Sequence, residues 1–149
     1  MCLKKLFIFT VLILNSLSVY SQSLSSYQWK NRLVLIQTTN PQNQLFNTQI
    51  QELADHLKGL EERRIVVFKF TPDSFQKGFE QDAPWENLNS SLKKDLHNSS
   101  EFEIILIGLD GGVKLRKNEF LSTDQLFRLI DQMPMRQSEI RKKKDGDNK

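Results

Sequence analysis

The sequence predicts an α/β domain with a central mixed sheet of about four strands, covered by helices on both faces. Residues 33–36 (LVLI), 65–70 (IVVFKF) and 102–107 (FEIILI) are nearly continuous apolar runs, which is typical of strands buried on both faces. Helical periods of apolar residues separate these runs. An Asp-Gly-Gly turn after the third run predicts a β-hairpin that adds a fourth strand.

The first apolar run is followed by a predicted helix. Asn40 and Pro41 fit an N-cap with proline at the first helical position, and Gly59 fits the end of the helix. The apolar residues at helical spacing are Phe46, Ile50, Leu53, Ala54, Leu57 and Leu60. After the second strand, residues 71–87 show no period and predict a long loop with one helical turn at most. A short second helix is predicted from Leu88, Leu92 and Leu96.

The predicted domain ends with the hairpin and a last helix. Residues 113–116 alternate in polarity, which predicts a half-exposed antiparallel strand. Ser122 and Gln125 form a capping box. The core-facing residues of this helix are expected to be Leu126, Phe127, Ile130 and Met133. The order strand, helix, strand, helix, strand, strand, helix fits a thioredoxin-like three-layer sandwich.

The N-terminus has the layout of a secretory signal peptide. Lys4 and Lys5 precede an apolar stretch at residues 6–14, and polar and small residues follow. A membrane anchor is the alternative, but a spanning helix needs about 20 apolar residues. We therefore expect cleavage between Ser21 and Gln22 and export to the periplasm or beyond. The predicted organisation is signal peptide 1–21, domain 22–134, and a charged, flexible tail at 135–149.

Cysteine content and charge exclude several functions for the mature chain. The single cysteine, Cys2, lies in the predicted signal peptide, so thiol-disulfide oxidoreductase and cysteine peroxidase chemistry are excluded. Whether the protein is some other enzyme stays open. Removal of residues 1–21 takes away two lysines and lowers the formal net charge from +3 to +1. A charge this small gives little reason to expect nucleic-acid binding.

Three stretches resemble a known family. "YQWKNRLVLI", "IILIGLDGGVKLR" and "LFRLIDQMPMR" are similar to the secreted thioredoxin-like domain of unknown function called P-DUDES. The resemblance extends from about Tyr27 to Arg141. The family occurs as single domains in bacteria and within vertebrate matrix and sushi-repeat proteins. It implies a thioredoxin-like fold, with a role as a redox relative or as a matrix interaction module.

The hallmarks of thioredoxin redox chemistry are missing from this chain. Redox thioredoxins carry a cysteine pair at the corner after the first strand, where a helix N-terminus stabilises the thiolate. That corner here reads Thr38-Thr39-Asn40-Pro41. A proline before the third strand is also expected, and Glu103 is the nearest match. The resemblance therefore implies a scaffold that is kept without its thiol chemistry.

Two sets of residues are candidates for a ligand or partner surface. Thr38, Thr39 and Asn40 would hold an anion or a peptide backbone at the helix start, although plain capping explains them as well. Lys114 and Arg116 are expected on one face of the fourth strand. With Arg136 and Arg141 they would form a basic patch for an acidic partner or a polysaccharide, or simply a solvated face.

The remaining candidates give weaker indications. His56 and His97 are the only histidines, too few for a metal site, and we expect no metal or cofactor. Aromatic residues either cover the sheet edges or mark a protein-binding surface: Tyr27, Trp29, Phe75, Phe79 and Trp85. The favoured hypothesis is a non-catalytic interaction module of the cell envelope, with an envelope or extracellular protein or a polysaccharide as partner. The alternative is a non-thiol enzyme or accessory factor in the envelope oxidative-stress response.

Overall fold

The computed structural model describes residues 23–89, 92–93, 96 and 100–147. Six strands form one mixed sheet in the order β4-β3-β2-β1-β5-β6. Their bounds are β1 Arg32–Thr38, β2 Ile65–Phe70, β3 Ser74–Lys77, β4 Glu86–Asn87, β5 Phe102–Ile107 and β6 Val113–Lys117. The helices are η1 Leu24–Tyr27 (a short 3₁₀ helix), α2 Gln44–Ala54, α3 Leu57–Glu62, α5 Thr123–Asp131 and α6 Pro134–Asp147.

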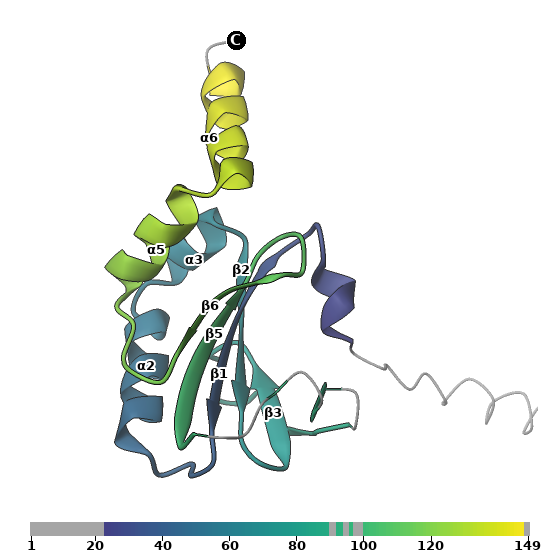
Figure 1. The fold of residues 1–149 in the computed structure, drawn as a ribbon, viewed down its shortest axis with the longest axis vertical. Coiled ribbons are helices and arrows are strands. Elements are labelled where there is room, and N and C mark those ends of the chain that lie inside the picture. The colour runs from purple at the N-terminus through teal and green to yellow at the C-terminus, as the bar shows by residue number, and fades with distance from the viewer. Residues whose placement is uncertain (1–22, 90–91, 94–95, 97–99, 148–149) are drawn as a thin grey trace, which may run out of the picture.

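The predicted fold class is confirmed. β1 pairs in parallel with β2 and antiparallel with β5, and β6 pairs antiparallel with β5. The chain crosses from β1 to β2 through α2 and α3, and α5 follows β6 (Figure 1). This is the thioredoxin-like arrangement that the order of elements predicts. The sheet has six strands rather than about four, because residues 74–77 and 86–87 extend it at one edge.

The two faces of the sheet carry two separate cores. Val34 and Ile36 point toward α2, α3 and α5 and pack with Phe46, Leu53 and Ile130. The alternate residues of β1 point to the other face. They pack in a second cluster of Leu33, Leu35, Phe68, Phe70, Phe75, Leu92, Leu96 and Ile105, beside η1. Figure 1 shows α2, α3 and α5 together on one face of the sheet and η1 apart from them.

The first predicted helix is two helices, and its predicted cap is wrong. The break comes at Asp55 and His56, between α2 and α3. Asn43 caps α2 by accepting a hydrogen bond from the backbone N–H of Phe46 at 3.1 Å, so the helix begins after Pro41 rather than at it. Gly59 lies inside α3 rather than at the end of a helix. A β-carbon at this position would come within 2.5 Å of the Phe127 ring. The glycine therefore permits close packing of α3 on α5.

Residues 71–87 are not the long loop that their lack of period predicts. β3 pairs antiparallel with β2, β4 pairs antiparallel with β3, and Phe75 is buried in the second core. Short strands at a sheet edge bury few side chains, so they leave little apolar pattern in the sequence. The second predicted helix lies partly outside the described residues, and within them Leu92 and Leu96 are buried.

The segment that the sequence predicts as a charged tail is helical where the structure describes it. It forms α6, which projects from the end of the domain near α5 (Figure 1). Glu139 on α6 accepts hydrogen bonds from three arginines. Arg32 and Arg64 are distant from it in the sequence, and Arg136 lies one turn earlier in α6. These ion pairs fix the first turns of the helix to the sheet. The charged composition of this segment does not by itself reveal those partners.

The predicted signal peptide, residues 1–21, lies outside the described residues. Within the part of the chain that the structure describes, no helix has the length and apolar character needed to cross a membrane.

Candidate functional site

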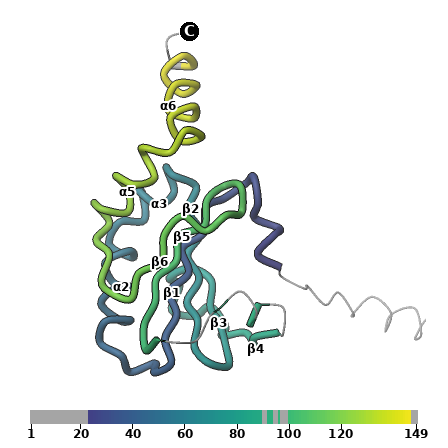
Figure 2. The backbone as a smooth tube through the Cα atoms, viewed as in Figure 1, coloured from purple at the N-terminus to yellow at the C-terminus, as the bar shows by residue number. Residues whose placement is uncertain are grey.

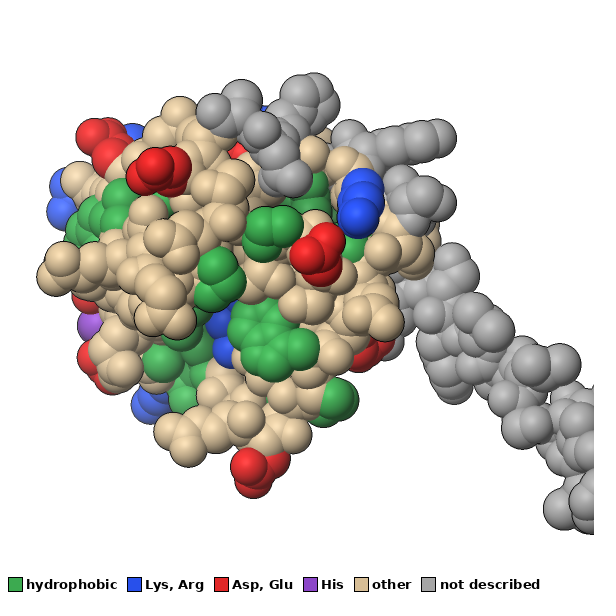
Figure 3. Space-filling view, turned by 90° about the horizontal axis from the view of Figure 1, so that it is seen from below, with side chains coloured by type: hydrophobic (Ala, Val, Ile, Leu, Met, Phe, Trp, Pro, Cys, Tyr) green, Lys and Arg blue, Asp and Glu red, His purple; other side chains and the backbone are tan. Residues whose placement is uncertain are grey.

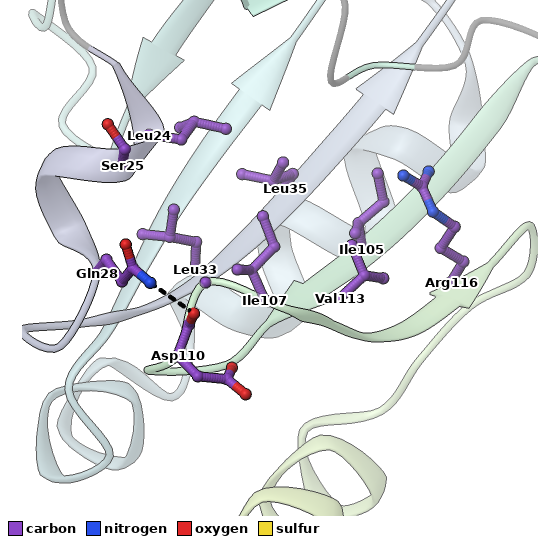
Figure 4. A pocket seen from close by; sticks show the side chains of 11 residues that line it. Leu24, Ser25, Gln28, Leu33, Leu35, Ile105, Ile107, Asp110, Val113 and Arg116 are labelled. Carbon is purple, nitrogen blue, oxygen red and sulfur yellow. Dashed lines mark hydrogen bonds between the residues drawn. The ribbon is translucent and has the colours of Figure 1, made fainter.

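A cleft of about 400 Å³ opens on the face of the sheet that carries η1 (Figure 4). Apolar side chains of β1 and β5 form its floor: Leu33, Leu35, Ile105 and Ile107. Val113 and Arg116 of β6 stand along one side, and Leu24, Ser25 and Gln28 stand along the other. We call this site the η1–β6 cleft. It combines an apolar floor with a small number of polar groups at its rim, which is characteristic of binding sites.

The cleft exists because the β5–β6 turn reaches η1. The backbone N–H of Trp29 donates to the carbonyl of Leu109 at 2.6 Å, and the Gln28 amide donates to the carbonyl of Asp110 at 2.8 Å. Figure 2 shows the turn beside the chain that leads from η1 into β1. Gly111 has a φ of +79°, a conformation that favours glycine and closes the turn. The predicted hairpin is confirmed, and its turn forms one end of the cleft.

A β-bulge separates Lys114 from Arg116. Ile107 pairs with Val113 and Leu106 pairs with Leu115, so one step along β5 faces two steps along β6. Arg116 lines the η1–β6 cleft, whereas Lys114 lines a different cavity of about 340 Å³ beside Arg32. The prediction that these two side chains share a face is therefore wrong. Strict alternation does not hold across a bulge.

Arg116 forms the polar end of the cleft. Its Nη1 donates to Oε2 of Glu103 at 3.1 Å, and the amide of Gln37 donates to the same carboxylate. Glu103 and Gln37 are buried on β5 and β1. The Arg116 side chain is about one-third exposed, at 36%, so it is held by a buried anchor and still faces solvent. It can therefore meet an acidic group at the cleft without losing its own position.

The other basic candidates do not join Arg116 in a patch. Lys114 pairs with Asp110 at 2.7 Å, and this hydrogen bond, with a second from the Gly112 N–H, lowers the pKa of the Asp110 carboxyl. Arg136 pairs with Asp131 and Glu139 and lines a third cavity, of about 310 Å³. Arg141 contacts Ser138 within α6. The structure therefore does not assemble the predicted basic patch.

The corner at residues 38–41 is occupied by internal hydrogen bonds. The Thr38 hydroxyl donates toward the carbonyls of Glu101 and Asn40, and it accepts from the Asn40 N–H at 3.1 Å. Thr39 donates its N–H to Glu101, and the Asn40 side chain accepts from Gln42. Thr38 is buried. The polar groups of Thr38 therefore serve the turn and the approach of β5.

Glu52 and His56 also have structural partners. The Glu52 carboxylate accepts from the backbone N–H and the hydroxyl of Thr123, both at 2.8 Å, and these bonds lower its pKa. His56 Nδ1 lies 2.7 Å from the carbonyl of Glu52. Among the described residues, no group of three or more potential ligands is placed to hold a metal ion. His97 lies outside them.

The aromatic candidates divide into buried and exposed groups. Tyr27 packs edge-on against Phe68 with ring centroids 5.5 Å apart, and Phe75 stacks on Phe70. These rings cover the sheet. Trp29 and Trp85 are exposed, at 61% and 47%, and neither lines the η1–β6 cleft.

Sequence reasoning missed the η1–β6 cleft because its walls come from four separate stretches. The floor residues look like ordinary buried strand residues, and nothing local marks Leu24 or Gln28 as rim residues. The Asp-Gly-Gly turn was the one available signal. It located the hairpin, but it did not show that the turn contacts η1.

Comparison with known proteins gives a family and a likeness to a solved structure. No curated protein matches the sequence. Among solved structures, the chain is similar to the reduced 2-Cys peroxiredoxin of Plasmodium vivax, with 16% sequence identity and a TM-score of 0.48. The likeness covers 72% of this chain and 80% of the peroxiredoxin chain. A family model described as a domain of unknown function, DUF4174, matches residues 23–139. The chain therefore belongs to the DUF4174 family.

Proposed function

We propose that the protein is an exported, non-catalytic binding module whose η1–β6 cleft receives apolar side chains of a protein partner. The single observation that carries this proposal is the apolar floor of the cleft between two polar rims, with Arg116 anchored at one end. An acidic residue of the partner would pair with Arg116, while an apolar side chain would be buried over Ile107 and Val113.

A protein partner suits the cleft better than a polysaccharide. Sugar rings are commonly bound against aromatic faces, whereas the lining of this cleft contains aliphatic side chains and no aromatic residue among the described ones. Aliphatic floors match Leu, Ile, Val or Met side chains of a peptide segment.

The location of the protein is part of the same proposal. The basic, apolar and polar succession in residues 1–21 supports export, and the three resembling stretches support a secreted P-DUDES type of domain. A secreted domain without cysteines must rely on its core alone for stability. The two buried clusters on either face of the sheet supply that core.

The non-thiol enzyme alternative has less support. It would use the corner at residues 38–41, but the Thr38 hydroxyl already contacts Asn40 and Glu101. A catalytic hydroxyl needs a base within hydrogen-bond reach, and the groups around Thr38 are backbone atoms.

The proposal is tested by affinity capture from the protein's own envelope fraction. We expect wild type to retain a discrete partner that Val113→Glu loses, because a carboxylate would enter the apolar cleft and repel an acidic partner. Leu57→Glu is the matched control, since Leu57 is exposed to a similar degree (54% against 50%) and lies on α3. A partner retained equally by both variants, or turnover of a substrate by purified protein, would contradict the proposal.

A further inference from the structure

Lys69 lies buried in the sheet on the face opposite the η1–β6 cleft. It occupies β2, where Ile36 of β1 and Gln76 of β3 are its neighbours in register. Its exposed fraction is 6%, so more than nine-tenths of the side chain is removed from solvent. Lysine is almost never buried to this extent unless it is paired.

Lys69 has no ionic partner in the described part of the chain, and it donates no hydrogen bond there. Its characteristic contact is the Trp85 ring, whose centroid lies 5.9 Å from Nζ. Arg32 provides the contrast: it is only 1% exposed, but its guanidinium pairs with Glu139 and donates to the carbonyl of Arg63. An ammonium that lacks such partners loses part of its hydration without compensation when the rest of its side chain is buried.

The surroundings of Lys69 favour the neutral amine. Its neighbours Ile36, Gln76 and Trp85 are uncharged, so none of them compensates the ammonium charge by an ion pair. Burial lowers the pKa of Lys69 below its ordinary value. A neutral lysine amine is a nucleophile, and desolvated lysines of this kind form Schiff bases with carbonyl compounds.

The residue that covers Lys69, Trp85, is itself exposed to solvent. Trp85 belongs to the connection between β3 and β4 and is about half exposed. The Gln76 amide donates to the carbonyl of Ala83, which ties this connection to β3 beside Lys69. Figure 3 views the end of the molecule at which β1 and β2 finish, where hydrophobic side chains lie at the surface among polar and charged ones.

We propose that Lys69 is a covalent attachment site for a small aromatic aldehyde, held beneath the Trp85 ring. The Nζ lone pair attacks the carbonyl carbon and forms a carbinolamine. Loss of one water molecule then gives an imine, so the sum is amine plus aldehyde going to imine plus water, without any oxidant or reductant. The ring of the aldehyde would lie against Trp85, where two aromatic rings attract each other beyond their burial.

The test is reductive trapping on the folded full-length chain. Benzaldehyde is added with sodium cyanoborohydride near neutral pH, and the modified lysines are mapped by peptide mass spectrometry over time. Lys69 is expected to react several-fold faster than the exposed Lys30, Lys58 and Lys93. Each unit by which a lysine pKa falls gives about tenfold more neutral amine at a given pH.

Variants separate this site from general surface reactivity. Lys69→Met should lose the fast adduct while its melting temperature stays at or above that of wild type. Lys77→Arg changes an exposed lysine on the adjacent strand β3 and should keep the fast adduct. Trp85→Leu should slow the reaction with benzaldehyde more than the reaction with formaldehyde, which has no ring. If Lys69 reacts no faster than Lys93, or reacts only in denaturant, the proposal is overturned.

Discussion

Two buried basic residues show how the environment of a single side chain determines its chemistry. Arg32 and Lys69 lie on neighbouring strands and on the same face of the sheet. Arg32 is satisfied at its two Nη atoms by Glu139 and by a backbone carbonyl, although its Nε has no partner among the described residues. Lys69 has only the Trp85 ring. We therefore assign a structural role to Arg32 and a chemical one to Lys69.

Replacing Lys69 by methionine is expected to stabilise the protein. Methionine keeps the length and apolar contacts of the side chain and removes an amine that has no ionic partner, so the free energy of unfolding should rise by about 1 kcal/mol at neutral pH. Urea denaturation of Lys69→Met and wild type measures the difference. Lys77→Met, on an exposed neighbour, should change stability by no more than about 0.5 kcal/mol.

The pH dependence of this difference has a defined sign. Because the pKa of Lys69 is lower in the folded state than its ordinary value of 10.5, the unfolded chain binds more protons between the two values. Wild-type stability should therefore rise through that window, and the advantage of Lys69→Met should disappear above it. If Lys69→Met stays more stable than wild type by a constant amount up to about pH 11, the lowered pKa of Lys69 is contradicted.

At the scale of elements, one carboxylate attaches α6 to the domain. Burial raises the pKa of Glu139, but hydrogen bonds from Arg64, Arg32 and Arg136 outweigh it and lower the pKa overall. Asp131 repeats this arrangement with Arg63 and Arg136. The two acids and four arginines link β1, α3, α5 and α6 in one network.

Glu139→Gln is expected to destabilise the protein by about 3 kcal/mol, because it leaves buried Arg32 without its anionic partner. The ion pairs of Glu139 contribute fully above its ordinary pKa of 4.5 and are lost as pH falls through the lowered folded value. Denaturation from pH 7 to pH 3 measures this, and the variant should be less sensitive to acid. Glu119→Gln removes an exposed pair with Lys117 and should cost no more than about 0.5 kcal/mol. Equal losses in the two variants would refute the network.

The contact between α3 and α5 gives a second prediction for elements. A β-carbon at Gly59 would overlap the Phe127 ring, which the Arg63 guanidinium holds from 4.2 Å. Gly59→Ala should therefore cost about 1–2 kcal/mol, since the overlap outweighs the gain in helix propensity of about 1 kcal/mol. With Phe127→Leu the same change should become neutral or stabilising, as a double-mutant cycle would show. A stabilising Gly59→Ala in the wild-type background would show that the ring moves away freely.

At the scale of the whole molecule, the sequence predicts the strands and helix caps that have a local pattern. It does not predict the edge strands or the contacts between residues that are distant in the sequence. The apolar runs at 33–36, 65–70 and 102–107 fall within β1, β2 and β5, and the Ser122 cap is confirmed with the Gln125 N–H at 3.3 Å. β3 and β4 are too short and too near the edge to leave a period. The helix α6 depends on Glu139 meeting Arg32, which lies 107 positions away.

The candidate site follows the same rule. The sequence indicates Arg116 as a candidate, but it shows neither the ion pair of Arg116 with Glu103 nor the bulge that turns Lys114 away. Thr38, Thr39 and Asn40 were considered because of their place in the fold, and tertiary hydrogen bonds to Glu101 occupy Thr38 and Thr39. Spacing along the chain gives neither bulges nor contacts between η1 and the β5–β6 turn.

The central claim, that the η1–β6 cleft holds a protein partner, is tested most directly by site-specific photocrosslinking in the native cells. A benzophenone amino acid replaces Val113 in the cleft or, as the control, Leu57 on α3. The account predicts a discrete protein adduct from position 113 that is absent from position 57 and is abolished by Arg116→Glu. The same adducts from both positions, or an adduct at position 113 that persists with Arg116→Glu, would contradict it.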